Sequence, residues 1–417
     1  MKSKKILSCV VALVFLFVFK GVADPVESVS ASVDQIAPQL IEIADYIHDN
    51  PELGNQEFKA VETLTAYLAS NGFIIEKGVA GLDTAFIATY VNAGGNGPAI
   101  SFLAEYDALA EIGHGCGHNI IAASCVGAAV ALSKNLSSVP AKVIVFGCPA
   151  EETTSGKIPM AKEGLFKQSD VGMQMHPGSG GASIGSKTLA LNLVDFIYEG
   201  EASHAASSPE RGRSALDGVM LMFMGTEFLR EHVKSDIRIH GIVTNGGAAA
   251  NVVPEKASAR FYIRGAERPY LNSVVERVYN IAKGAAIMTE TKVTIQEIKQ
   301  YDNVVNVSSF IDLGAEVSRL YGVEKIRKIQ PSDAAGASTD FGTASSHIPC
   351  LMFSLPVAPQ NVAGHSRAYT EATKSLLAHE VVLTSAKIMA LTGYKIIEDP
   401  TLLAQIKTDW QAAVSGD

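Results

Sequence analysis

Two residues with metal-binding side chains stand close together in the segment GHGCGHN, at residues 113–119. Cys116 and His118 are two positions apart, and the glycines around them allow the loop to turn both side chains toward one metal ion. A glycine-rich loop in front of a helix can also be a plain turn. The segment alone therefore favours a metal site without requiring one.

Two adjacent carboxylates follow in the segment CPAEE, at residues 148–152. Glu151 and Glu152 come directly after an apolar run typical of a buried strand, where a pair of carboxylates is costly unless it faces positive charge. One of the two can bind a metal ion while its neighbour transfers protons. On a solvated loop the same pair would have neither role.

Two histidines also stand where strands are expected to end. His176 closes an apolar run in the segment MHPG, and His365 follows a later run and a loop that contains proline. A single histidine of this kind is more often structural, but all of these residues lie at or after the carboxyl ends of expected strands, where open α/β sheets bind ligands. The combined set has the ligand types of a site for two zinc-like ions: Cys116, His118, Glu152, His176 and His365.

The elements that must position these residues alternate between helices and strands. Helices are expected at residues 33–48, 56–71, 118–134, 157–166 and 375–392, and strands at 84–91, 99–107, 142–148, 170–176 and 350–355. The first two strands flank a turn-rich segment and are predicted to pair as a hairpin. The pattern predicts an α/β domain with helices on both faces of a mixed sheet.

A different pattern begins near residue 187. Strands are expected at residues 189–199, 237–244, 256–265 and 292–298, with helices at 213–233 and 271–286. The order β-α-β-β-α-β is that of a ferredoxin-like unit. We therefore predict a lid or dimerisation domain at residues 187–298, inserted into a catalytic metal-binding domain formed by residues 24–186 and 299–417.

The first residues predict export. Three lysines within the first five residues precede an apolar stretch from Ile6 to Phe19, and small residues follow it up to Ala23. This is the pattern of a signal peptide covering residues 1–23 and cleaved after Ala23. The alternative is an uncleaved membrane anchor, for which the stretch is short. We expect a periplasmic or secreted protein with no stable membrane span after cleavage.

Charge and cysteine content narrow the class of protein further. The formal net charge of −9 argues against nucleic acid or an anionic membrane as the main partner. Besides Cys116, the expected mature chain contains Cys125, Cys148 and Cys350. Export would permit disulfides, but these three lie in or beside apolar runs, so we expect buried free thiols.

The chain resembles the aminoacylase and glutamate-carboxypeptidase family of dinuclear zinc metallopeptidases, over essentially the whole expected mature chain. Within that family it is most similar to the amidohydrolase subgroup, which includes plant indole-acetyl-amino-acid hydrolases, bacterial p-aminobenzoyl-glutamate hydrolase and an animal β-alanyl-lysine dipeptidase. The resemblance rests on ordered segments: HDNPELGNQEFKA, FLAEYDAL, GHGCGHN, CPAEE, MHPG, SHAA, NVVPEKASARFYIR and STDFG. It implies a catalytic α/β domain with an inserted lid, and a homodimer formed through that lid.

The resemblance also implies roles for single residues. Glu151 would be the general base and acid, Asp107 would orient the metal site, and His204 on the lid would stabilise the oxyanion. Asn251 and Arg264 would hold the substrate carboxylate. Two divalent ions, zinc first and manganese next, would bind the five metal ligands. His48 and His114 match family positions as well, and we interpret both as structural.

The sequence departs from the family pattern at two places. Gly115 stands where many members have alanine, and Ser338-Thr339-Asp340 stands where many have Ser-Glu-Asp. The second departure leaves the substrate role of that loop open.

These features predict a metal-dependent amidohydrolase that cleaves N-acyl amino acids or small dipeptides with a free carboxylate. Metal-activated water would be the nucleophile, and Glu151 would take its proton and return it to the leaving amine. Because His204 lies on the expected lid, either the lid closes or a partner subunit supplies this residue. Substrates like β-alanyl-lysine or p-aminobenzoyl-glutamate are the alternative. An esterase and a non-catalytic ligand-binding relative remain as other classes.

Overall fold

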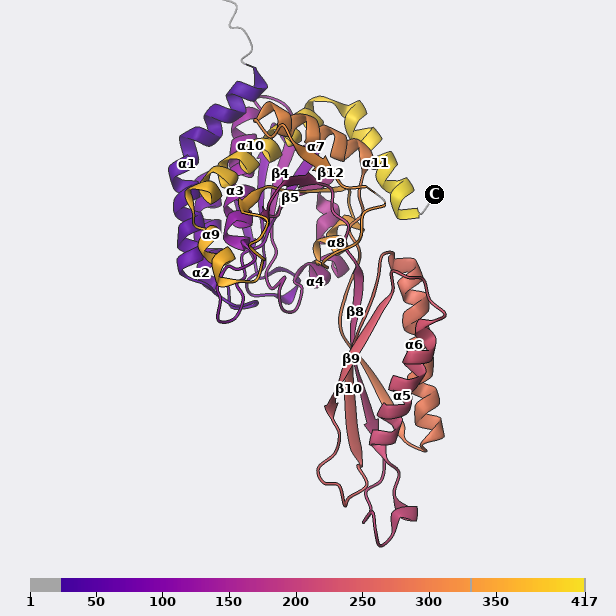
Figure 1. Ribbon diagram of the computed structural model, residues 1–417. Helices are drawn as coiled ribbons and strands as arrows, with labels where there is room; N and C mark the ends of the chain where they lie inside the picture. The colour runs from indigo at the N-terminus through magenta and orange to yellow at the C-terminus, as the bar shows by residue number, and fades with distance from the viewer. Residues whose placement is uncertain (1–23, 331, 416–417) are drawn as a thin grey trace, which may run out of the picture.

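The computed structural model describes residues 24–330 and 332–415. The predicted signal peptide, residues 1–23, lies outside these residues. Figure 1 shows an α/β body and, extending from it, an elongated unit in which a second sheet carries two helices on one side. The α/β body contains both the early and the late parts of the chain.

The α/β body is built on an eight-stranded mixed sheet with the order β1-β2-β4-β3-β5-β13-β7-β12. Neighbouring strands run parallel from β4 through β3 and β5 to β13. The carboxyl ends of these central strands therefore meet at one edge of the sheet. The strands are β1 (Ile74–Lys77), β2 (Phe86–Asn92), β3 (Ala99–Ala104), β4 (Ala141–Gly147), β5 (Val171–Met175), β7 (Ala182–Ile184), β12 (Ile326–Lys328) and β13 (Cys350–Ser354).

Helices cover both faces of this sheet because the central strands are apolar on both sides. In β4, Val143 and Val145 join the core under one helix layer, while Ile144 and Phe146 join the core on the other face. The first layer contains α1 (Pro25–Asp49), α2 (Phe58–Ser70), α3 (His118–Asn135), α7 (Ser308–Leu320) and α10 (Leu376–Glu398). The second contains η1 (Val79–Gly81), α4 (Lys157–Lys162), η2 (Leu165–Gln168) and α8 (Phe341–Ser345).

Three further elements complete the body. A separate two-stranded ladder joins β6 (Gly178–Ser179) to β14 (Pro356–Ala358), and α9 (Arg367–Ala372) and α11 (Pro400–Ser415) follow. Helix α10 is the one described helix long and apolar enough to cross a membrane, and 61% of its apolar window is buried inside the protein. It packs against α3 and α1, which makes it a core helix of the α/β body.

The first helix is longer than its apolar spacing predicts. It begins at Pro25 rather than near Val33, because the Asp24 side chain accepts a hydrogen bond from the Val26 N–H (3.0 Å) and proline is favoured in a first helical turn. The predicted hairpin is wrong. Strand β4 lies between β2 and β3, antiparallel to the first and parallel to the second.

The elongated unit has the strand order β11-β8-β10-β9, with every neighbouring pair antiparallel. With helices after the first and third strands, this is ferredoxin-like topology. Its elements are β8 (Ala190–Glu199), η3 (Pro209–Arg211), α5 (Ala215–Arg230), β9 (Arg238–Asn245), β10 (Lys256–Gly265), α6 (Arg268–Met288) and β11 (Lys292–Tyr301). The predicted boundaries of the inserted domain stay a prediction.

The two strands that connect this unit to the α/β body lie side by side. β8 enters it and β11 leaves it, and Leu191 pairs with Tyr301 at the junction. Arg268 ties the two strands together, since its guanidinium donates to the carbonyls of both residues and forms an ion pair with Asp302 (2.8 Å).

Candidate active site

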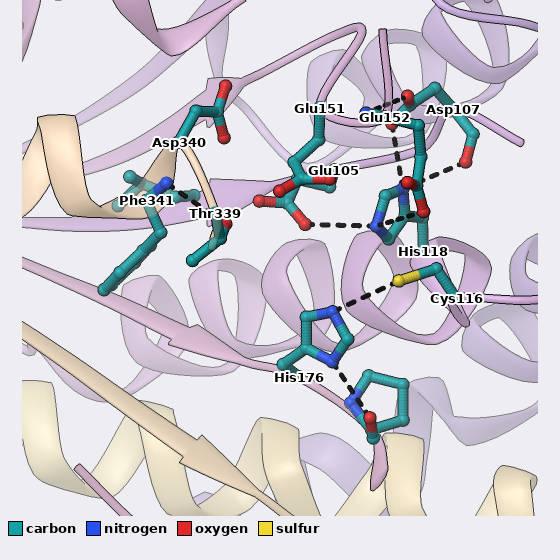
Figure 2. A network of polar contacts seen from close by, with 12 residues as sticks. Glu105, Asp107, Cys116, His118, Glu151, Glu152, His176, Thr339, Asp340 and Phe341 are labelled. Carbon is teal, nitrogen blue, oxygen red and sulfur yellow. Dashed lines mark hydrogen bonds and ion pairs between the residues drawn. The ribbon is translucent and has the colours of Figure 1, made fainter. Parts of the chain in front are cut away.

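The predicted metal ligands meet at the carboxyl edge of the parallel strands. Figure 2 shows four of them, Cys116, His118, Glu152 and His176. Glu152 follows β4, His176 follows β5, and His365 lies in the loop after β14. Cys116 and His118 come from the loop after β3 and the first residue of α3. The sheet topology therefore brings together five residues that span 250 positions of the sequence, from Cys116 to His365.

Short distances join these side chains into one cluster. Cys116 Sγ lies 3.5 Å from His176 Nε2, and Glu152 Oε1 lies 3.5 Å from His365 Nε2 and 4.0 Å from His118 Nε2. Three groups of ligand atoms each fit within 4.8 Å: Cys116 with His118 and His176, Cys116 with Glu152 and His365, and His118 with Glu151 and Glu152. Overlapping groups of this size suit more than one ion.

Hydrogen bonds fix which nitrogen of two histidines faces the cluster. His118 Nδ1 donates to the Asp107 carboxylate (2.8 Å) and carbonyl (3.0 Å), and His176 Nδ1 donates to the Pro177 carbonyl (2.9 Å). With Nδ1 as the donor, Nε2 is the nitrogen of each ring that faces the cluster, and it can bind a metal ion once it carries no proton. Burial also lowers the pKa of His176, which keeps that ring neutral.

Several buried atoms of the cluster have no hydrogen-bond partner among the described residues. They are His118 Nε2 and Glu152 Oε1, together with Glu105 Oε2 beside them. Buried polar atoms of this kind are costly unless a further group satisfies them. Thiol, imidazole and carboxylate groups with unsatisfied atoms fit divalent metal ions.

Cys116 must lose its thiol proton before it can act as a metal ligand. Burial raises the pKa of its thiol to about 12, so the metal-free protein keeps the proton on sulfur at neutral pH. A bound ion would displace that proton, because the thiolate is the ligand form.

Glu151 stands beside the cluster without belonging to its predicted ligand set. Burial, and then the negative charges of Glu105 and Asp340, raise the pKa of Glu151 to about 8. A carboxyl group with a pKa near neutrality can both accept and return a proton at working pH. Figure 2 shows Glu151 between Asp340 and the cluster.

The backbone before Glu151 is held in an unusual conformation. Ala150 has a φ of 59°, in the left-handed region that costs a residue with a Cβ roughly 1–2 kcal/mol. Its N–H donates to Glu57 Oε1 (2.8 Å), and Glu57 Oε2 accepts from the Thr84 hydroxyl (2.7 Å). Glu57 is fully buried and is not among the predicted site residues, although it lies in the HDNPELGNQEFKA segment.

Asp107 has the orienting position that the resemblance implied. Beyond its bonds to His118, its second carboxylate oxygen accepts from the Glu152 N–H (2.9 Å). Burial favours the neutral acid, but His118 and this N–H outweigh it and hold the pKa of Asp107 below its usual value. One carboxylate thus positions two of the predicted ligands.

A buried ion network lies behind Glu151, and sequence reasoning does not find it. Lys157 Nζ donates to Glu105 Oε1 (2.5 Å) and to Asp340 Oδ1 (2.6 Å), and all three side chains are no more than 1% exposed. Asp340 is the last polar residue of STDFG, and Glu105 lies two positions before Asp107. A lysine six positions after Glu151 gives no sequence signal of burial.

Two predicted residues lie far from the cluster. His204 and Asn251 are exposed neighbours, joined through the Ala205 N–H and the Asn251 carbonyl (3.0 Å), in the loops after β8 and before β10. These loops are at the end of the elongated unit opposite its junction with the α/β body (Figure 1). The strand β8 has 10 residues, which corresponds to roughly 30 Å. The structure does not bring either residue to Glu151.

Arg264 lies at the near end of the same unit. It pairs with Leu191 at the junction, its guanidinium carbon is 5.1 Å from the centre of the Tyr262 ring, and its buried Nε has no hydrogen-bond partner among the described residues. Lys299 of β11 donates to the Glu151 carbonyl (3.4 Å). This end of the unit therefore contacts the loop that follows β4 and carries Glu151.

A cavity of about 710 Å³ opens over the cluster. Its walls include Glu151 and Glu152, the serine-rich segment from β6 to residue 188, and the loop that carries Ser338 and Thr339. His48 and His114 lie outside it. Burial lowers the pKa of His114 to about 3, which keeps it neutral in the core.

A two-metal ligand set, a neighbouring carboxyl group and a cavity at the carboxyl edge of an α/β sheet together define a metal-dependent hydrolase. Comparison with known proteins gives the family. Residues 103–389 match the model of peptidase family M20/M25/M40, and the chain belongs to this family. The predicted class, a metal-dependent amidohydrolase or metallopeptidase, is thereby confirmed.

Two curated relatives and one solved structure illustrate the similarity. The chain is 30% identical to one of the subunits of p-aminobenzoyl-glutamate hydrolase from Escherichia coli, over 89% of this chain and 91% of that protein. It is 32% identical to Xaa-Arg dipeptidase of Mus musculus, over 91% and 90%. A dinuclear metal-binding peptidase of this family from Bacillus subtilis shares the fold, with a TM-score of 0.66 at 19% identity over 88% and 99%.

Proposed function

We propose that this protein hydrolyses the amide bond between an acyl or aminoacyl group and an amino acid with a free carboxylate. The observation that carries the proposal is the position of Glu151, beside a two-metal ligand set at the wall of a cavity. The relatives support the reaction class, since their names describe hydrolysis of an aroyl amino acid and of dipeptides.

The five predicted ligands would hold two divalent ions, zinc first and manganese next, because thiolate and imidazole suit borderline-soft metals. When bound, such ions lower the pKa of a water molecule and polarise a carbonyl group. Glu151 would accept the proton of the attacking water and pass it to the nitrogen of the leaving amine. Asp107 holds His118 and the Glu152 backbone in place.

The described cavity wall offers a basic substrate side chain no acidic partner of its own. Among the lining residues that the structure describes, the acidic side chains are Glu151 and Glu152, and both are assigned to the metal site and the proton transfer. A basic side chain would therefore find no further carboxylate there to pair with. We therefore rank acyl-glutamate substrates above dipeptides that end in lysine or arginine.

The experiment is amide hydrolysis by the purified protein with zinc or manganese, beside Glu151→Gln. The panel contains p-aminobenzoyl-glutamate, N-acetyl amino acids, dipeptides that end in lysine or arginine, and the ester counterpart of the best amide. Turnover that is lost in Glu151→Gln and after chelation supports the proposal. A metal-loaded chain that cleaves only the ester, or nothing in the panel, contradicts it.

The distance of His204 and Asn251 from Glu151 supports a homodimer through the elongated unit. In such a dimer the far end of one unit could reach the cluster of the partner, and both residues would serve there. The outer face of α5 offers a contact surface, because Met220, Met224 and Phe228 are 56%, 53% and 70% exposed and four positions apart.

Mixing two inactive variants tests this arrangement. Glu151→Gln lacks the proton-transfer group and His204→Ala lacks the far-end group. A mixed dimer would contain one complete site, built from the catalytic domain of the second chain and the elongated unit of the first. Recovered activity after mixing supports subunit sharing. Activity that stays absent although mixed dimers form excludes a site shared between subunits. Copurification with a different chain of this family, in place of a second copy, would identify that chain as the partner.

Export completes the proposal. The segment of residues 1–23 supports it by its basic, apolar and small-residue order. Mass spectrometry of the protein recovered outside the cytoplasm gives the test. A chain that begins at Asp24 agrees with cleavage, and an intact chain in the membrane fraction shows an anchor instead.

A further inference from the structure

Glu105 presents a carboxylate oxygen to the metal cluster, although it belongs neither to the predicted ligand set nor to the proton-transfer step. Its Oε2 is buried, has no hydrogen-bond partner among the described residues, and lies 3.4 Å from His118 Nε2. Figure 2 shows the Glu105 carboxylate turned toward His118, on the same side as Glu151. Its other oxygen, Oε1, accepts the hydrogen bond from Lys157.

The distance from Glu105 to His118 is that of two ligands of one ion. Nitrogen and oxygen ligands bind zinc at about 2.1 Å, so two of them at a tetrahedral angle lie roughly 3.4 Å apart. Glu152 Oε1, a predicted ligand, is farther from the same nitrogen at 4.0 Å. The separation of Glu105 Oε2 from His118 Nε2 therefore needs little adjustment to accept a shared ion.

Lys157 accounts for the charge and the orientation of Glu105. A fully buried carboxyl group ordinarily keeps its proton, which would spoil it as a ligand. The ammonium of Lys157 lies 2.5 Å from Glu105 Oε1 and supplies the positive charge that a buried carboxylate needs. Asp340 binds the same ammonium and the Lys157 backbone N–H (3.1 Å), so the lysine cannot swing away.

We propose that Glu105 is a further metal ligand, at the ion that His118 binds, and that Lys157 is a positioning residue that holds it there. This inference rests on the proposed function, because it adds a ligand to the same metal site. It gives the buried lysine a purpose: one carboxylate oxygen is fixed by Lys157, and the other is left for the ion.

Metal binding by the metal-free protein tests the inference without using activity. Zinc affinity and stoichiometry are measured by chelator competition and elemental analysis for the parent chain, Glu105→Gln and Lys157→Met. The controls are Glu163→Gln and Lys162→Met, two exposed residues next to the same helix or on it. We expect about 10- to 100-fold weaker binding of one of two ions in both test variants and no change in the controls.

Cobalt(II) and a double variant separate a ligand from a structural residue. The visible spectrum of the cobalt-loaded protein reports coordination number, so it should change in Glu105→Gln. If Lys157 acts through Glu105, Lys157→Met should weaken binding no further once Glu105 is Gln. Should Lys157→Met not fold, Lys157→Gln takes its place, because its amide still donates a hydrogen bond.

The outcomes distinguish this inference from the proposed function. Two ions bound with parental affinity and an unchanged cobalt spectrum in Glu105→Gln would mean that Glu105 only pairs with His118 in the metal-free protein. If Lys157→Met lowers zinc affinity equally in the parent chain and in Glu105→Gln, the positioning role of Lys157 would be overturned. A parent chain that binds fewer than two ions would overturn both the inference and the proposed function.

Discussion

The buried network of Lys157, Glu105 and Asp340 makes a quantitative prediction about stability. The substitution Lys157→Met keeps the length of the side chain and removes its charge, leaving two carboxylates that are no more than 1% exposed without their ammonium partner. Removing one member of a buried ion pair costs about 3–5 kcal/mol, because the remaining charge is not compensated. We expect a loss of that size in the free energy of unfolding.

Thermal unfolding of the metal-free protein is the assay. With an unfolding entropy of ~2.1 cal/mol/K per residue over ~400 residues, a loss of 3–5 kcal/mol lowers Tm by about 4–6 °C. The matched control replaces all three residues together, as Lys157→Met with Glu105→Gln and Asp340→Asn. Because no unpaired charge then remains, the control should lose less stability than the single variant.

The stability loss should also depend on pH. In the parent chain the pKa of Glu105 lies below its usual value. Its contribution is therefore fully present above the unfolded pKa of about 4.3 and is lost as pH falls through the folded pKa. In Lys157→Met the isolated carboxylates have raised pKa values, so acid stabilises that variant. The difference in Tm between the parent chain and Lys157→Met should therefore become smaller from pH 7.5 to pH 4.5. A difference under 1 °C at pH 7.5, or a difference that grows in acid, would refute the reasoning.

Three further outcomes are expected. Glu151→Gln should lower kcat by about 10²- to 10⁴-fold with two ions still bound, as measured by steady-state kinetics and elemental analysis. Glu57→Ala should lower kcat more than it changes KM, because Ala150 loses its hydrogen-bond acceptor, while Glu57→Gln should stay close to the parent since its amide can still bond to Ala150 and Thr84. Zinc affinity of the metal-free protein should rise between pH 6 and pH 8, because binding displaces the proton of a Cys116 thiol whose pKa is about 12. A pH-independent zinc affinity would show that the thiolate is not a ligand.

The sequence predicted that the five candidate ligands lie together, because most of them have a local signal. Cys116 and His118 share a glycine-rich loop, and Glu152 and His176 directly follow apolar strands. The parallel strands then bring these loops to one edge, as the general geometry of α/β sheets requires. Strand pairing itself has no such local signal. The turn-rich segment between β2 and β3 is typical of a hairpin. The strand that lies between them in the sheet is β4, which begins more than 40 residues later in the sequence.

Lys157 and His204 show what the sequence could not predict. A lysine after a polar loop is expected in solvent, and only the tertiary structure shows its two carboxylate partners from β3 and the loop before α8. The role predicted for His204 comes from a motif that matches the family. The motif gives its role there but not its distance from Glu151 within a single chain. A local motif therefore indicates a residue's role but not how far the tertiary structure holds that residue from the other site residues.

The side-by-side entry and exit of the elongated unit has a consequence for protein synthesis. Residues 190–301 form a contiguous four-stranded sheet with its own core, so this unit can fold as soon as it leaves the ribosome. The large sheet cannot, because β5 must wait for β13, whose last residue is Ser354. During that interval the edge of β5 has unpaired backbone groups and can pair with another chain, which leads to aggregation. We therefore expect the nascent first half of the α/β body, rather than the inserted unit, to be the segment that chaperones protect.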